Sequence, residues 1–180
     1  MFIPLIQKRR SIRRFLKRDV EPEKIDLLVE AALRAPSSRG LNPWEFIVIT
    51  ESEKLERLST AKEHGSSFLK NASLGIVVCA DPKKCDVWVE DTSIASIFIH
   101  LAALSLSLGS CWIQIRDRMH NDMMTAEEYI AGVLKIPANL KVESIVAIGY
   151  PDEEKPPHAK EELQYEKVHN NVYGTAFGHR

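Results

Sequence analysis

Residues 9–15 read RRSIRRF and residues 35–44 read APSSRGLNPW, and these two stretches decide what fold and site to expect. The first gathers arginine side chains around a serine hydroxyl, and a phosphomonoester requires several charge-assisted donors of this kind. The second supplies turn residues with small hydroxyls and a side-chain amide directly before an apolar strand. Because the two stretches bracket one well-formed helix and end at a strand, together they favour a bound, phosphorylated, planar cofactor, and hence an enzyme.

Other interpretations of both stretches stay open at this point. Residues 1–20 carry seven Lys and Arg residues against one Asp, whereas residues 21–180 carry seventeen against twenty-four Asp and Glu residues. An amino end that is rich in arginine and poor in acids is also typical of a transit peptide or of an arm that binds nucleic acid. The same arginines could cover a solvated surface, and a Pro-Ser-Ser turn could be an ordinary loop.

The length and composition of the chain set broad limits. Its 180 residues suit one domain over 1–180, and a formal net charge of −1 gives no electrostatic reason to expect nucleic acid. The three cysteines Cys79, Cys85 and Cys111 indicate buried free thiols in a reducing compartment, and their spacing predicts no metal site. The charged residues 8–14 fall where a secretory signal needs its apolar core, so we expect a cytoplasmic protein.

Hydrophobic periodicity and turn residues predict the order of the elements. A short helix is expected over 4–10, and Pro22 opens a helix that places Ile25, Leu28, Val29 and Ala32 on one apolar face. Four strands are expected, over residues 45–50, 75–80, 111–115 and 142–149. Further helices are expected over 51–66, over 90–108, and from the capping box at 125–128 to Pro137. The mixture without strict alternation predicts the α+β class, with helices packed about one central sheet.

The segment from Thr92 to Ile115 contains no formally charged side chain, and this uncharged segment is long enough to raise the question of a membrane span. Several serines and His100 interrupt it, and Gly109 ends it as a helix, so a fully buried helix is the favoured interpretation. In a domain this small, complete burial of one helix needs a second subunit. Beyond Tyr150 the chain is rich in proline and charge, which indicates either disorder or an arm laid across a partner.

Taken together, these motifs resemble the nitroreductase superfamily of FMN-dependent NAD(P)H oxidoreductases. The resemblance rests on residues 9–15 and 35–44, on LGSCWI at 108–113, and on GYP at 149–151 with its charged tail. It implies an α+β fold with a central, mainly antiparallel sheet of four to five strands flanked by helices, in an intertwined homodimer. The arm over residues 151–180 is then expected to pack on the partner subunit.

The resemblance also implies a reaction. NAD(P)H reduces bound FMN and leaves, and an electron-poor acceptor of the nitroaromatic or quinone type takes its place in a ping-pong sequence. No side chain is expected to be catalytic, because the flavin carries the chemistry. Two other functions stay open: a nucleic-acid-binding protein that uses the basic arm over residues 8–18, with an affinity that falls steeply with salt, and a flavin-binding sensor or storage protein without turnover.

At the amino end, the resemblance assigns four residues to the cofactor. Arg9, Arg10, Ser11 and Arg13 match the phosphate and pyrimidine-edge motif. Arg9 and Ser11 are expected to hold phosphate or ribityl oxygens. Arg13 is expected near the pyrimidine side, where a cation would stabilise the anionic reduced flavin.

The remaining assignments lie further along the chain. The loop that reaches the flavin from the neighbouring subunit is matched by Pro36, Ser37 and Ser38. Asn42 falls where the motif usually has Gln or Asn. Trp112, Ile113 and Gln114 match the strand that runs along the ring, with the Gln114 N–H near N5. The chain departs from related small members here, because it has no glycine between Gly109 and Gly132. His158 and Lys160 stand where a basic pair returns to the phosphate.

Overall fold

The apolar, β-branched runs in residues 2–178, the part of the chain that the computed structural model describes, pair into a central sheet. The strands are β1 (Trp44–Ile49), β2 (Leu74–Ala80), β3 (Gly109–Gln114), β4 (Met119–Asn121), β5 (Met124–Thr125) and β6 (Lys141–Gly149). The α-helices are α1 (Phe2–Lys8), α2 (Pro22–Leu33), α3 (Ser52–Ser59), α4 (Trp88–Ser105) and α5 (Ala126–Leu134). The α+β prediction is confirmed.

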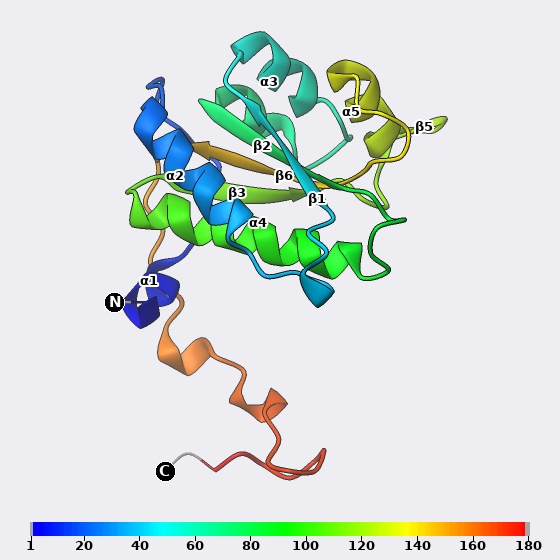
Figure 1. The fold of residues 1–180 in the computed structure, drawn as a ribbon. Coiled ribbons are helices and arrows are strands. Elements are labelled where there is room, and N and C mark those ends of the chain that lie inside the picture. The colour runs from blue at the N-terminus through cyan, green and yellow to red at the C-terminus, as the bar shows by residue number, and fades with distance from the viewer. Residues whose placement is uncertain (1, 179–180) are drawn as a thin grey trace.

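The sheet has the strand order β1-β2-β6-β3, and every neighbouring pair is antiparallel. Strands β4 and β5 form a separate two-stranded hairpin that the sequence did not predict. Helices α2 and α4 cover one face of the sheet, while α3 and α5 cover the other (Figure 1). The four-stranded antiparallel sheet with flanking helices agrees with the predicted architecture.

Two apolar cores fill these layers. One joins α3 and α5 to one sheet face, with Leu55, Ile130 and Ile145 almost fully buried. The other joins α2 and α4 to the opposite face through residues such as Leu28 and Ile99. The two cores lie on opposite faces because side chains alternate along each strand.

Two glycines let the basic amino-terminal segment lie against the sheet. A Cβ at Gly109 would lie 2.8 Å from Cγ2 of Ile12, and one at Gly149 would lie 3.0 Å from Cδ1 of Phe15. The Ile12 N–H donates to the carbonyl of Ser110 over 2.9 Å. The glycines of the LGS and GYP motifs are therefore where the RRSIRRF segment packs, which brings it beside β3.

The expected helix over residues 51–66 is shorter in the structure. Helix α3 ends at Ser59, and a turn then leads to a 3-10 helix over Ser67–Asn71. The hydroxyls of Ser59 and Thr60 donate to carbonyls three residues earlier, which offers the backbone an alternative to further helix. By contrast, the predicted capping box of α5 is present, since Thr125 and Glu128 exchange hydrogen bonds.

Helix α4 is buried on one side only in a single chain. Ala95, Ile99 and Ala103 are buried against the sheet, whereas Ile94 and Phe98 on the outer side are 37% and 38% exposed. The prediction of a helix buried on all sides is therefore not met within one chain. Among residues 2–178, no helix is both long enough and apolar enough to cross a bilayer.

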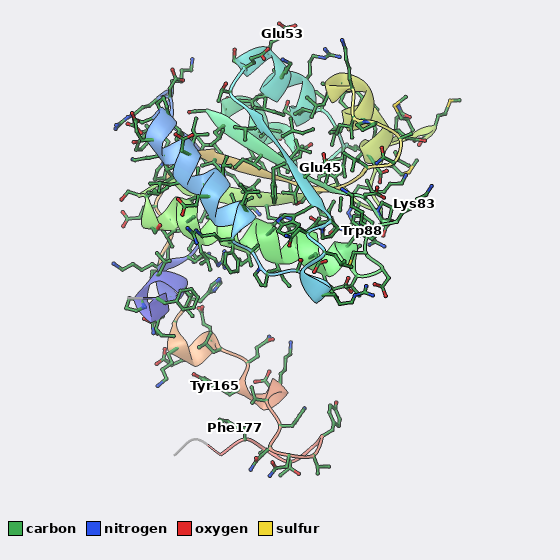
Figure 2. The ribbon with its side chains drawn as sticks, viewed as in Figure 1. Glu45, Glu53, Lys83, Trp88, Tyr165 and Phe177 are labelled. Atoms are coloured by element: carbon green, nitrogen blue, oxygen red, sulfur yellow. The ribbon has the colours of Figure 1, made fainter. Side chains whose placement is uncertain are left out.

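The carboxy-terminal segment extends away from the body of the molecule, past α1 (Figure 1). It contains 3-10 helices at Lys160–Glu162 and Tyr165–Lys167. Tyr165 and Phe177 lie on this extension, remote from the sheet (Figure 2). Nearly all of residues 157–178 are exposed, so this described part of the segment has no core of its own in one chain.

Candidate functional site

A basic cavity of about 240 Å³ lies between the amino-terminal segment, the second half of α4 and the start of the carboxy-terminal segment. Four cationic side chains line it, together with two acidic ones: Lys8, Arg9, Arg10, Lys155, Glu153 and Glu154. Helix α4 contributes His100 and Leu104 to its wall. The excess of cationic groups over acidic groups suits a phosphate dianion.

Lys155 is a member of this site that sequence reasoning missed. Its ammonium donates to the carbonyl of Ser11 over 2.7 Å and lies 3.2 Å from Glu153. The Glu153 carboxylate also accepts the N–H of Arg14 over 3.2 Å, and Arg10 donates to the carbonyl of Pro156. The available signal was the charged DEEK run at 152–155, directly after the GYP motif. The contacts of Lys155 with Ser11 and of Arg10 with Pro156 hold this part of the chain against the RRSIRRF segment.

A second cavity, of about 340 Å³, shares Arg9 and His100 with the first. Ser11 and Trp112 line it as well, together with small and apolar residues of α4. Trp112 lies on β3, an edge strand of the sheet, and is 42% exposed. The two cavities are therefore neighbours, one basic and one walled by an aromatic ring.

The outer edge of β3 is open beyond Ser110. Ile12 donates to the carbonyl of Ser110, and Lys62 donates over 3.1 Å to the carbonyl of Gln114 from the side away from β6. Because backbone groups of alternate residues point to the same edge of a strand, the N–H of Gln114 faces this edge too. Ile113 is 1% exposed and packs in the core, and by the same alternation its backbone groups face β6, so it offers this edge neither side chain nor backbone.

Lys62 and Arg13 flank this open edge. The Arg13 guanidinium lies 5.8 Å from the centre of the Phe68 ring. Burial, helped by the charge of Arg118, lowers the pKa of Lys62. Burial raises the pKa of the Cys111 thiol, and this shift is opposed by four nearby polar groups: Arg13, Ser11, Lys155 and Lys62. Lys62 is a second residue that the sequence patterns did not single out.

The loop of Pro36, Ser37, Ser38 and Asn42 lies at the other end of α4. The Ser38 N–H donates to Oδ1 of Asp91 over 2.8 Å, and the Ser37 hydroxyl donates to the Asn42 side-chain oxygen over 2.7 Å. Asp91 and His100 are nine helical residues apart, which is a rise of about 13 Å. In the described part of one chain, these loop residues line neither of the two cavities.

The predicted basic pair of the tail is placed outside the cavities of its own chain. His158 lies 3.5 Å from Glu162, with half of its side chain exposed, and Lys160 begins a 3-10 helix on the extension. The structure thus brings Arg9, Arg10, Ser11 and Trp112 together. It leaves the loop over 36–42 and the pair at 158 and 160 apart from them within one chain.

Comparisons with known proteins show to which family the chain belongs. Residues 6–88 match the sequence pattern of the Nitroreductase family. A solved structure described as an FMN-dependent nitroreductase from Clostridium difficile R20291 superposes with a TM-score of 0.94 at 51% identity, covering 95% of this chain and 99% of that one. The chain belongs to the nitroreductase family, as the resemblance of its motifs predicted.

Two curated relatives extend the comparison. A protein of Archaeoglobus fulgidus, whose name couples NADH dehydrogenase with NAD(P)H nitroreductase, is 41% identical over 157 residues, which are 85% of this chain and 87% of that protein. The NADPH-flavin oxidoreductase of Vibrio harveyi is 27% identical over 187 residues, covering 95% of this chain and 74% of that enzyme. The family relationship therefore extends over most of the chain.

Proposed function

We propose that the protein is an FMN-dependent oxidoreductase that moves a hydride from NAD(P)H to an electron-poor acceptor of the nitroaromatic or quinone type, in a ping-pong sequence. The observation that carries this proposal is that the basic cavity adjoins a second cavity at the open edge of β3. The two cavities share Arg9 and His100, and Trp112 lines the second one. The activities named for the relatives support FMN as cofactor and NAD(P)H as reductant.

The residues present fit a phosphorylated flavin. The cationic groups of the first cavity would neutralise its phosphate, chiefly Arg9 and Arg10 with Lys155. The exposed Trp112 offers an apolar surface to a planar ring, and the Gln114 N–H offers a donor at the ring edge. A cation at Arg13 would stabilise negative charge on the pyrimidine side. When bound, FMN supplies the hydride chemistry itself.

A second copy of the chain completes this proposed site. Ile94, Ile97 and Phe98 form an exposed apolar face on α4, and such faces mark interfaces in soluble proteins. If two α4 helices pack antiparallel about a two-fold axis, the partner's loop over 36–42 approaches the half of α4 that carries His100. The arm over 151–180 would pack on the partner, where the basic pair of His158 and Lys160 would contribute to the shared site.

Spectroscopy of the purified protein tests the proposal directly. We expect a yellow protein whose released flavin is identified as FMN by chromatography, and which is a dimer by light scattering. Addition of NADH or NADPH should bleach the flavin, and a quinone should restore its colour over many cycles. A colourless, monomeric protein that binds no added FMN would contradict the proposal, and bleaching without turnover would favour a flavin sensor or storage protein.

A further inference from the structure

His100 is a buried polar residue for which the proposed chemistry has no direct use. It lies on the inner side of α4, 5% exposed, and 91 residues from Arg9 in sequence. The Arg9 Nη1 atom is 3.2 Å from His100 Nε2, and the other ring nitrogen, Nδ1, contacts the hydroxyl of Ser110. One imidazole thus connects the amino-terminal segment to β3 through the wall that separates the two cavities.

The chemistry of the partners fixes the proton on this imidazole. A guanidinium has only donors, so Nε2 of His100 must be the acceptor and carries no proton. The proton of the neutral ring therefore sits on Nδ1, where it is donated to the Ser110 hydroxyl oxygen. The Ser110 hydroxyl can in turn donate to the His100 carbonyl at 3.5 Å. The hydrogen bonds therefore run in one direction: Arg9 donates to His100, and His100 donates to Ser110.

The surroundings keep the imidazole neutral. Burial, assisted by the charge of Arg9, lowers the pKa of His100 to about 4. Five other charged groups line the basic cavity beside His100. Two are cations of the amino-terminal segment and three belong to the carboxy-terminal segment: Lys8, Arg10, Glu153, Glu154 and Lys155. Ser110, the neighbour from β3, is uncharged. An imidazolium would carry an N–H towards the Arg9 guanidinium, and both groups would be cationic.

We propose that His100 is a positioning residue: its neutral, Nδ1-protonated imidazole holds the Arg9 guanidinium in place over the basic cavity, so that Arg9 discriminates a phosphorylated flavin from riboflavin. This inference rests on the proposed FMN site, because it gives Arg9 its ligand. An arginine has several rotatable bonds, and one fixed acceptor reduces the entropy that Arg9 loses when a phosphate binds. The remaining donors of the guanidinium stay available for the phosphate.

Flavin titrations of matched variants test the proposal. The flavin-free protein is titrated with FMN and with riboflavin, following the quenching of flavin fluorescence, in the wild type and in His100→Leu and His100→Gln. Loss of the acceptor in His100→Leu should weaken FMN binding about 10- to 100-fold and leave riboflavin binding unchanged. His100→Gln should restore FMN binding, because its amide oxygen can accept from Arg9. His64→Gln, with an 88% exposed side chain, is the control.

The wild-type protein offers a measurement that needs no variant. Nitrogen-15 NMR of the histidine rings at pH 7 should show His100 neutral, with the proton on Nδ1. An imidazolium or an Nε2-protonated ring would overturn the proposal, even if His100→Leu fails to fold. Ser110→Ala, which removes the acceptor of Nδ1, should weaken FMN binding less than His100→Leu does.

The outcomes separate this proposal from the proposed function. If the wild type binds FMN but both His100 variants keep the same preference for FMN over riboflavin, the positioning role is wrong and the flavin site stands. The same holds if FMN and riboflavin lose affinity equally, since that is the result of a general structural defect. If the wild type binds neither flavin, the proposed function fails, and the tautomer of His100 still decides whether Arg9 is held as described.

Discussion

The two ends of α4 position the two halves of the proposed site by different means. In the second half of the helix, buried His100 accepts a side-chain N–H from Arg9. At the start of the helix, Asp91, which is 3% exposed, accepts the backbone N–H of Ser38 and the thiol of Cys85. One helix therefore carries an anchor for Arg9, the arginine proposed to bind the phosphate, and another for the loop expected to reach a partner's flavin.

The difference between the anchors indicates what each controls. Contact with a backbone N–H fixes the path of the loop whatever side chains the loop carries. Contact with a guanidinium depends on one residue, Arg9, and on the protonation state of one imidazole. Changes at the Asp91 end should therefore appear first as lost stability, and changes at the His100 end as lost cofactor selectivity. The exposed face of α4 between them decides whether the two ends meet in a dimer.

The largest effect is expected on that shared face. In Ile97→Glu, a charge replaces a 42% exposed apolar side chain that the proposed dimer buries, and an unpaired buried charge costs several kcal/mol. We expect a folded monomer by light scattering that retains little FMN. Met119→Glu, which changes a 52% exposed side chain on the hairpin, is the control and should stay dimeric. A dimeric, flavin-loaded Ile97→Glu protein would place the interface elsewhere.

Arg9→Ala should produce the next largest effect. Removal of a charge-assisted hydrogen bond costs about 1.5–3 kcal/mol, so FMN affinity should fall about 10- to 100-fold while riboflavin affinity is kept. Titration with both flavins measures this difference. Arg14→Ala is the matched control from the same segment, because the Arg14 side chain is 71% exposed and pairs with Asp152. Equal FMN affinity in both variants would contradict the role of Arg9.

Much of the fold follows from sequence alone because its signals are local. The apolar face of α2, the capping box at Thr125 and the apolar strands each depend on neighbouring residues, and all are present. The shortened α3 was missed because the hydroxyls of Ser59 and Thr60 offer the backbone an alternative to further helix. The hairpin was missed because β4 and β5 are only three and two residues long.

The site was less predictable because its contacts are long-range. The motif pointed to Arg9 and Ser11, but nothing local connects Arg9 with His100, which the sequence patterns placed only within a buried helix. Likewise, Lys155 reaches Ser11 across 144 residues of sequence. The proposed roles of the residues at 36–42 and at 158 and 160 require a second copy of the chain, so these roles stay predictions.

Asp91→Ala tests the other end of α4. Without the carboxylate, the partly buried Ser38 N–H and the buried Cys85 thiol lose their acceptor, which costs about 1–3 kcal/mol of unfolding free energy. Thermal or denaturant unfolding of the flavin-free protein measures this loss. Asp91→Asn keeps one oxygen for Ser38 and should be less affected. A variant as stable as the wild type would mean that the loop is held by its own Ser37 and Asn42 contacts.

The smallest effect is expected between the two ends, at Glu143 of β6. Its side chain is 3% exposed, and its Oε2 atom has no hydrogen-bond partner among the described residues. Burial raises the pKa of Glu143, although Ser144, Trp112 and Ser93 approach the carboxyl and oppose this shift. Glu143→Gln removes the buried charge and keeps the shape, so it should raise the unfolding free energy at pH 7 by about 1 kcal/mol.

The pH dependence of this gain has a definite sign. Because the native pKa of Glu143 is raised, its contribution to stability is present below the ordinary carboxyl pKa and is lost as pH rises through the native value. His100 acts in the opposite direction: its native pKa of about 4 lies below 6.5, so its contribution is present above 6.5 and is lost as pH falls towards 4. Denaturant unfolding at pH 5 and pH 8 should therefore give Glu143→Gln its larger gain at pH 8, and a gain that is larger at pH 5 would contradict the raised pKa of this carboxyl group.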